Sequence, residues 1–189
     1  MSYLNTDYKH TLCLESTVTD WSTRAVRVAV ALAFCADHPA MWFHWNWGGR
    51  LPRQCATERL SLKTKPLDLV KLSAEVHAQE RIWIVHQTLH HLRRIYSLNL
   101  SSVTWVQSSV EHFRHLLDRQ LKELDVCVRK PGSESKPRKN AAILKYFQKL
   151  REFLKQKGFS NCAWEVTRTE TTMHLKQLLL IMAKISRDH

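Results

Sequence analysis

Apolar side chains recur every three or four residues along most of the chain beyond residue 66. This spacing places them on one face of an α-helix, with polar residues opposite. The pattern predicts a long helix over 67–96, a second over 106–128, a third over about 140–157 and a last one from about 162. In the last helix Leu179, Leu180 and Ile181 widen the apolar stripe. We therefore expect an all-α protein.

Proline and glycine mark where these helices begin and end. Pro66 stands at the entrance of the first long helix, a position that suits proline. The run 129–132 contains Pro-Gly and ends the second helix, and residues 133–139 have no apolar side chain. Gly158 is expected to cap the third helix. Segments 48–65 and 130–139 are thus predicted to be the long connections.

The first 47 residues fit the helical pattern least. Residues 21–36 could be helical, but Pro39 follows closely. The apolar run 28–36, preceded by two arginines, resembles the core of a signal peptide, and it could equally belong to a first core helix. It is too short to span a membrane. We divide the chain into an N-terminal extension, 1–47, and a helical bundle, 48–189.

The chain is strongly basic, with 29 Lys and Arg against 17 Asp and Glu and a formal net charge of +12. Such a field attracts phosphate backbones, anionic lipid and sulfated polysaccharides. A nucleic-acid reader usually gathers its cations on one element, whereas here they lie at several helix ends and in a loop. Sulfated glycans are therefore kept as possible partners, and nucleic acid as a weaker alternative.

Catalytic motifs are absent from the sequence. With 4 glycines, a phosphate-cradling loop is nearly excluded. His86 and His90 have the spacing of a zinc-protease helix, but Gln87 stands where the catalytic glutamate belongs. His112 and His115 lack a third ligand. We expect no enzyme, no metal and no cofactor.

Five cysteines, at 13, 35, 55, 127 and 162, are too widely spaced for a zinc knuckle or a redox pair. This spacing suits disulfides formed in an oxidising compartment, and the odd number leaves one cysteine over. The sequon Asn99-Leu100-Ser101 predicts glycosylation at Asn99 and agrees with secretion. If the protein is intracellular, all five are reduced thiols instead.

The chain resembles the type I interferons, and fish members in particular, over roughly residues 48–185. The resemblance is carried by 51–55, 102–105, 121–127, Tyr146-Phe147-Gln148-Lys149-Leu150 and Cys162-Ala163-Trp164-Glu165-Val166-Thr167-Arg168. It implies an up-up-down-down four-helix-bundle cytokine fold of about five helices with long crossover loops. It also implies a disulfide between Cys55 and Cys162, and a second one between Cys127 and either Cys13 or Cys35.

Members of this family act by bridging two receptor chains. The resemblance implies that one receptor chain contacts Arg59, Arg168, Thr172 and Met173, and the other Lys149, Arg114 and Asp118. An arginine can form a bidentate pair with a receptor carboxylate. Arg168 could instead pack against Glu165 or simply face solvent.

Three functions follow from these observations. The first is a secreted, monomeric interferon that binds a two-chain class II cytokine receptor and induces an antiviral response without inserting into the membrane. The second is another class II helical cytokine with a different receptor pair. The third is an intracellular basic protein that binds nucleic acid.

Overall fold

The computed structural model describes residues 50–128 and 140–187. Within these two ranges the chain forms helices and no strand, which confirms the all-α prediction. The helices are the 3-10 helix η2 (Arg53–Cys55), α4 (Ala56–Ser61), α5 (Leu69–Leu72), α6 (Ala78–Tyr96), α7 (Gln107–Val128), α8 (Ala141–Gln156) and α9 (Asn161–Arg187). The predicted extension 1–47 and the connection 130–139 lie outside the described residues.

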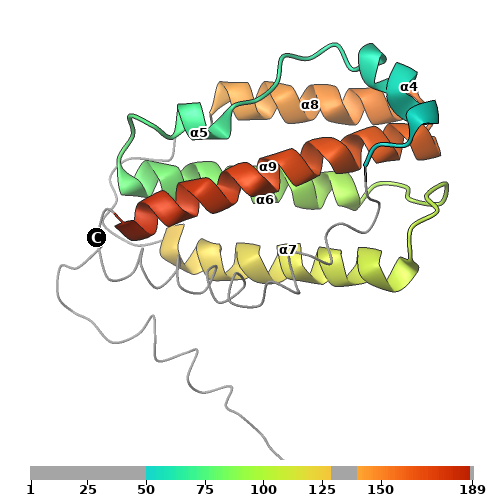
Figure 1. Cartoon of the computed structure of the whole chain (residues 1–189). Helices are drawn as coiled ribbons and strands as arrows, with labels where there is room; N and C mark the ends of the chain where they lie inside the picture. The colour runs from blue at the N-terminus through green and yellow to red at the C-terminus, as the bar shows by residue number, and fades with distance from the viewer. Residues whose placement is uncertain (1–49, 129–139, 188–189) are drawn as a thin grey trace, which may run out of the picture.

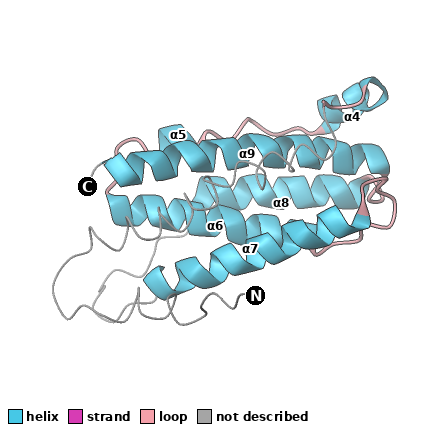
Figure 2. Cartoon of the chain, turned by 60° about the horizontal axis from the view of Figure 1, so that its bottom comes forward, coloured by secondary structure: helices cyan, strands magenta, loops and turns pink. Residues whose placement is uncertain are grey.

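The four long helices lie side by side, with α6 in the centre (Figures 1 and 2). Helix α6 packs against α7, α8 and α9, and the short helices α4 and α5 pack on α9. Helices α6 and α8 run in one direction and α7 and α9 in the other (Figure 1). The first helix of the expected up-up-down-down order falls in residues that are not described.

The apolar stripes of the long helices meet in one core, and aromatic side chains fill one end of it. Tyr96 contacts Phe113 edge to face at a ring-centroid distance of 4.7 Å, and Trp105 and Trp164 stand 6.1 Å apart. Their polar atoms are hydrogen-bonded: the Tyr96 hydroxyl donates to Thr171 Oγ1, the Trp105 indole to Glu165 and the Trp164 indole to the Asn99 carbonyl. Truncating a buried aromatic side chain typically costs about 3 to 5 kcal/mol, so this end contributes strongly to stability.

Local signals in the sequence set both ends of α8. The Asn140 side chain accepts hydrogen bonds from the amides of Ala142 and Ile143 at 3.0 and 3.3 Å, as an N-cap does. At the other end Gly158 has a φ of +58°, a conformation that glycine adopts without strain. The predicted cap at Gly158 is therefore confirmed.

Two predictions about the helices were wrong. The helix predicted over 67–96 is interrupted after α5, where the Ser73 carbonyl accepts a hydrogen bond from Arg81 Nε at 3.0 Å. This bond stabilises a turn before α6 begins. Leu180 is 60% exposed, because residues two apart on a helix face nearly opposite directions and Leu178 faces the core.

The predicted connection 48–65 is partly helical, since it contains η2 and α4. Cys55 ends η2 and is fully buried, while α4 has no buried residue. The connection is thus anchored in the core at Cys55, and α4, which follows directly, lies on the surface.

Candidate functional site

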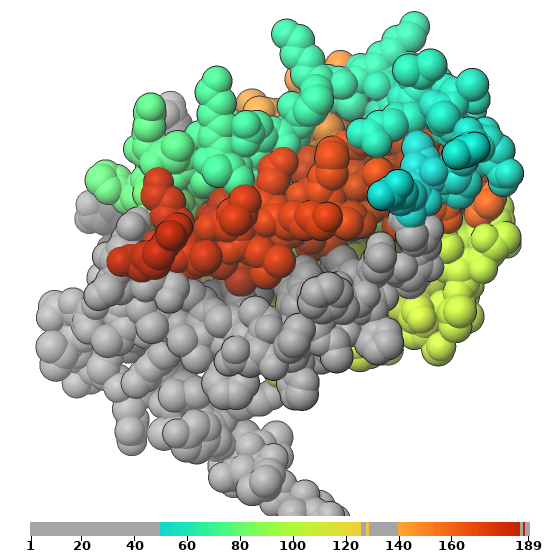
Figure 3. All heavy atoms as spheres, viewed as in Figure 1, coloured from blue at the N-terminus to red at the C-terminus, as the bar shows by residue number. Residues whose placement is uncertain are grey.

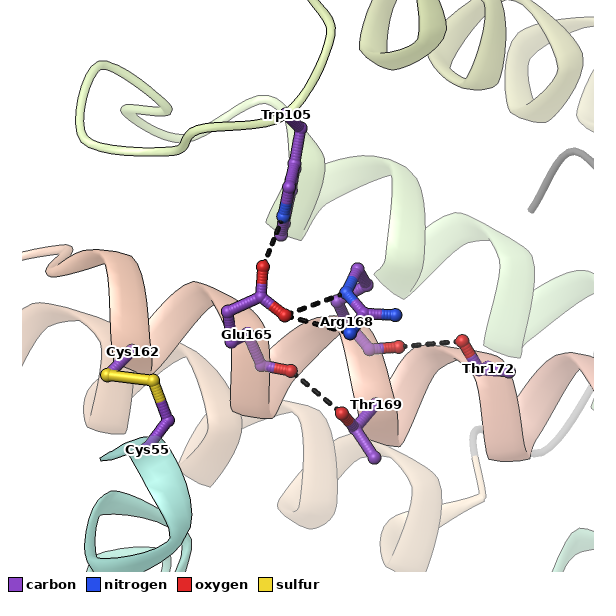
Figure 4. Close-up of polar contacts among 7 residues, drawn as sticks. All are labelled: Cys55, Trp105, Cys162, Glu165, Arg168, Thr169 and Thr172. Carbon is purple, nitrogen blue, oxygen red and sulfur yellow. Dashed lines mark hydrogen bonds and ion pairs between the residues drawn. A yellow bond between two sulfur atoms is a disulfide. The ribbon is translucent and has the colours of Figure 1, made fainter. Parts of the chain in front are cut away.

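A disulfide joins the first connection to the last helix. Cys55 and Cys162 are bonded, with Cα atoms 5.0 Å apart, and close a loop of 107 residues (Figure 4). Closing a loop of this size stabilises the fold by roughly 4 to 5 kcal/mol in the chain-entropy model. The pairing implied by the resemblance is therefore present. Cys13, Cys35 and the side chain of Cys127 are not described, so the second disulfide stays a prediction.

An ion pair holds α4 to α9 beyond the disulfide. Arg59 Nη2 lies 3.0 Å from Glu170 Oε1, with the Arg59 side chain 43% exposed and the Glu170 side chain 7% exposed. The other carboxylate oxygen of Glu170 accepts a hydrogen bond from the Tyr146 hydroxyl at 2.7 Å. Burial, and then the charge of Glu170, raise the pKa of Tyr146, so its hydroxyl stays protonated and donates. Arg59 is thus fixed in position and still reachable from solvent.

Leu60 follows Arg59 on α4 and is 82% exposed, the highest value among the large apolar side chains that the structure describes. On the same helix, Glu58 Oε1 pairs with Lys157 Nζ at 3.1 Å, which ties α4 to the end of α8. The disulfide and two ion pairs therefore hold a helix that presents an arginine and a leucine outward.

Arg168 lies elsewhere, in a buried network. It is 3% exposed, and its Nε and Nη2 donate to Glu165 Oε2 at 3.0 and 2.8 Å (Figure 4). The other oxygen of Glu165 accepts from the indole of Trp105 at 2.5 Å. The structure places Arg168 against Glu165, which is one of the arrangements that the sequence left open.

Thr172 and Met173 are half-buried on α9. The Thr172 hydroxyl donates to the Arg168 carbonyl at 3.0 Å (Figure 4). Met173 is one turn from Thr169 on the helix, next to Lys176 and Leu180, which are both exposed. These four residues form the outward stripe of α9.

The second predicted set of receptor residues is divided between two helices. Lys149 lies on α8, where its Nζ donates to the Lys63 carbonyl at 3.4 Å. Arg114 and Asp118 lie on α7, on the opposite side of α6 (Figure 1). Arg114 Nε donates to the Tyr96 carbonyl at 2.6 Å, and Asp118 pairs with Arg93. Lys149 therefore does not share a surface with the other two.

A model of the interferon alpha/beta domain matches residues 45–185. The chain belongs to the interferon alpha/beta family. This family consists of cytokines rather than enzymes, as the sequence predicted.

Individual relatives of this interferon-family chain come from mammals and fish. Interferon alpha-21 of Homo sapiens is 38% identical over 96 residues, which cover 48% of this chain and 51% of that protein. Interferon a3 of Oncorhynchus mykiss is 27% identical over 121 residues, covering 64% and 66%. The chain thus spans about half to two thirds of the length of the curated relatives it matches.

A solved structure, zebrafish interferon 1, has a TM-score of 0.58 and 26% sequence identity, and the match covers 74% of this chain and 99% of that one. The chain therefore has the interferon helical cytokine fold and resembles fish members of the family, as the sequence motifs implied.

Other sequence candidates of this interferon-family chain lie at the ends and sides of the bundle. Asn99 is exposed between α6 and α7, where its Oδ1 accepts from the Ser101 amide at 2.9 Å. His86 Nε2 lies 2.8 Å from Asp125 Oδ1. In residues 50–128 and 140–187 no group of three or more potential ligands could hold a metal ion. None of the helices in those ranges is long and apolar enough to cross a membrane.

Sequence reasoning missed Leu60 and Glu170. Leu60 has no signal in the pattern, because exposed and buried leucines look alike in a short helix. Glu170 pairs with a residue of the first connection, a contact that only the tertiary structure reveals.

Proposed function

We propose that this chain is a secreted type I interferon that bridges a two-chain class II cytokine receptor and induces an antiviral response. The observation that carries the proposal is the outward pair Arg59 and Leu60, held on α9 by the Cys55–Cys162 disulfide and the ion pair with Glu170. Arginine is enriched among interface hot spots, and the exposed apolar side chain beside it adds surface that a partner can bury. Family membership supports the cytokine role.

The first receptor chain contacts α4 and the outward stripe of α9 in this proposal. Helix α4 packs on α9, and Figure 3 shows α9 exposed along its length, so these two helices form one continuous surface. Arg59 and Leu60 contribute from α4, and Met173 contributes from the outward stripe of α9, with the half-buried Thr172 next to it in the sequence. Arg168 takes part by holding Glu165, because its guanidinium faces that buried carboxylate.

The second receptor chain contacts α7 around Asp118. Bridging needs two surfaces that do not overlap, and α4 and α7 lie on different sides of the bundle (Figure 1). The Asp118 and Arg93 side chains are 50% and 55% exposed, so a receptor cation or anion can reach either one. Arg114 supports this surface through its bond to the Tyr96 carbonyl, and Lys149 falls outside it.

The test uses this 189-residue chain expressed in fish cells. Wild-type protein is expected in the medium, where it should trigger receptor-dependent phosphorylation and protect cells from virus. Activity confined to the lysate, or none in either fraction, would overturn the proposal of a secreted interferon.

The site is tested with Leu60→Ala, because a side chain that is 82% exposed can be removed without disturbing the core. Loss of a hot-spot contact worth about 2 kcal/mol lowers receptor affinity roughly 30-fold. Gln156→Ala, an exposed neutral change on α8, is the control and should keep wild-type potency and melting temperature. Full potency of Leu60→Ala would refute the site while leaving the family role intact.

A further inference from the structure

Positive charge is unevenly distributed over the described part of the chain. Residues 50–65 contain five basic side chains and one acidic one, a net charge of +4. Residues 140–157, which include α8, also contain five basic side chains and one acidic one. Helix α7 carries three basic and four acidic side chains, a net charge of −1. The first connection and α8 thus hold much of the excess charge.

These two basic segments lie together in the fold. Lys149 Nζ donates to the Lys63 carbonyl at 3.4 Å, and Lys157 Nζ lies 3.1 Å from Glu58 Oε1. Figure 3 shows α8 emerging behind the first connection, on the side of the molecule away from α7. Because Glu58 is already paired with Lys157, it does not neutralise Lys63 or Lys65.

The cations on this side form a short row. Lys63, Lys65 and Lys145 are exposed, and Lys149 is half-buried beside Lys63. Lys145 and Lys149 are one helical turn apart, about 6 Å along α8. We call these four residues the basic row. Long lysine side chains in such a row fit a flexible polyanion with repeated charged groups.

We propose that the basic row binds a sulfated polysaccharide of the cell surface or matrix. Proteins that hold single-stranded nucleic acid stack its bases on exposed aromatic rings. In residues 50–65 and 140–157 the aromatic side chains are Tyr146, Phe147 and Phe153, and all three are buried. This face therefore offers charge without a stacking surface. The choice of polysaccharide also rests on the secretion proposed above.

The experiment measures binding of a heparin oligosaccharide to the full, oxidised chain at several salt concentrations. The test variant is Lys63→Ala/Lys65→Ala/Lys145→Ala, which removes three exposed charges from the basic row. The matched control is Arg94→Ala/Arg119→Ala/Lys122→Ala, which removes three exposed charges from α6 and α7. Both variants have the same net charge and leave the core unchanged.

The test variant should bind at least tenfold more weakly, and its plot of log K against log salt should be less steep by roughly one unit per removed cation. The control should lose much less. If both variants lost the same amount of heparin affinity, net charge alone would explain the binding. The proposal that the basic row is the binding site would then be overturned. Tighter binding of single-stranded DNA of matched charge would overturn the choice of polysaccharide.

The signalling assay and the heparin-binding assay, applied to both variants, separate this inference from the proposed function. Leu60→Ala should lose signalling and keep heparin binding. The triple lysine variant should lose heparin binding and keep receptor-dependent signalling, since none of its three residues lies in the proposed receptor surfaces. A triple variant that binds heparin like the wild type would refute the basic row even if the chain signals as an interferon.

Discussion

Replacing Arg168 with alanine should destabilise the bundle, because it removes the cation that neutralises Glu165. The Glu165 side chain is 6% exposed and accepts two hydrogen bonds from Arg168. After the replacement, the one side-chain donor left to its carboxylate among the described residues would be the Trp105 indole. Removing one partner of a buried ion pair costs about 3 to 5 kcal/mol. Domains typically have a total stability of about 5 to 15 kcal/mol, so the variant should still fold.

The free energy of unfolding is measured by urea titration of the oxidised full chain, followed by circular dichroism. Glu165→Gln in the Arg168→Ala background should recover part of the lost stability, because it removes the unpaired charge. A double-mutant cycle over these two residues should give a coupling free energy of about 1 kcal/mol or more. The cycle distinguishes loss of the pair from a general loss of packing around Arg168.

The opposite result would assign Arg168 to the receptor surface. Surface substitutions usually change stability by less than about 0.5 kcal/mol. If the free energy of unfolding of Arg168→Ala lies within that margin of the wild-type value and the variant loses receptor-dependent signalling, the reasoning from burial is refuted. Arg168 would then contact the receptor, as the family resemblance implied.

Three further predictions concern stability. Gly158→Ala should cost about 1 kcal/mol in urea unfolding, because φ is +58° while nothing lies within 4 Å of the added Cβ; an unchanged midpoint would contradict this. Cys55→Ser should remove up to about 5 kcal/mol; a variant that melts like the wild type would show that the disulfide does not constrain the chain. Burial lowers the pKa of His174 from 6.5 to about 4, and neither ring nitrogen has a hydrogen-bond partner within the described part of the chain. Because the unfolded chain takes up the proton first, stability should fall from pH 6.5 towards pH 4 by up to about 3 kcal/mol, and His174→Leu should flatten this slope.

The spacing of apolar residues was sufficient to predict the position of a helix whose two ends carry capping residues. Helix α8 was predicted to within about one residue, because Asn140 and Gly158 cap it. The break between α5 and α6 was missed, because the apolar spacing continues through it. The bond from Arg81 to the Ser73 carbonyl lies at that break, and no pattern of apolar positions reveals such a contact.

The sequence predicted where in the chain the candidate site lies. It did not predict which of its side chains face solvent. The resemblance located Arg59 and the disulfide near each other, because Cys55 is four residues away on the same short segment. It did not reveal that Glu170 fixes Arg59 or that Leu60 points outward, since both depend on how α4 packs on α9. Exposure is a property of the tertiary structure, and a short helix with no buried residue has no amphipathic pattern to indicate it.

The block of sequence that most clearly resembles the interferons, 162–168, is also one of the most buried parts of the chain. Ala163, Trp164, Val166 and Thr167 have no exposed surface, and Glu165 and Arg168 are 4% and 3% exposed. Side chains in such surroundings are restricted by packing and hydrogen bonding, since even small changes of volume or charge there cost stability. The resemblance in this block is therefore stronger support for the fold than for a receptor contact. Receptor contacts are better sought among exposed side chains on the elements that this block fixes, and α4, bonded to Cys162 through Cys55, is the nearest such element.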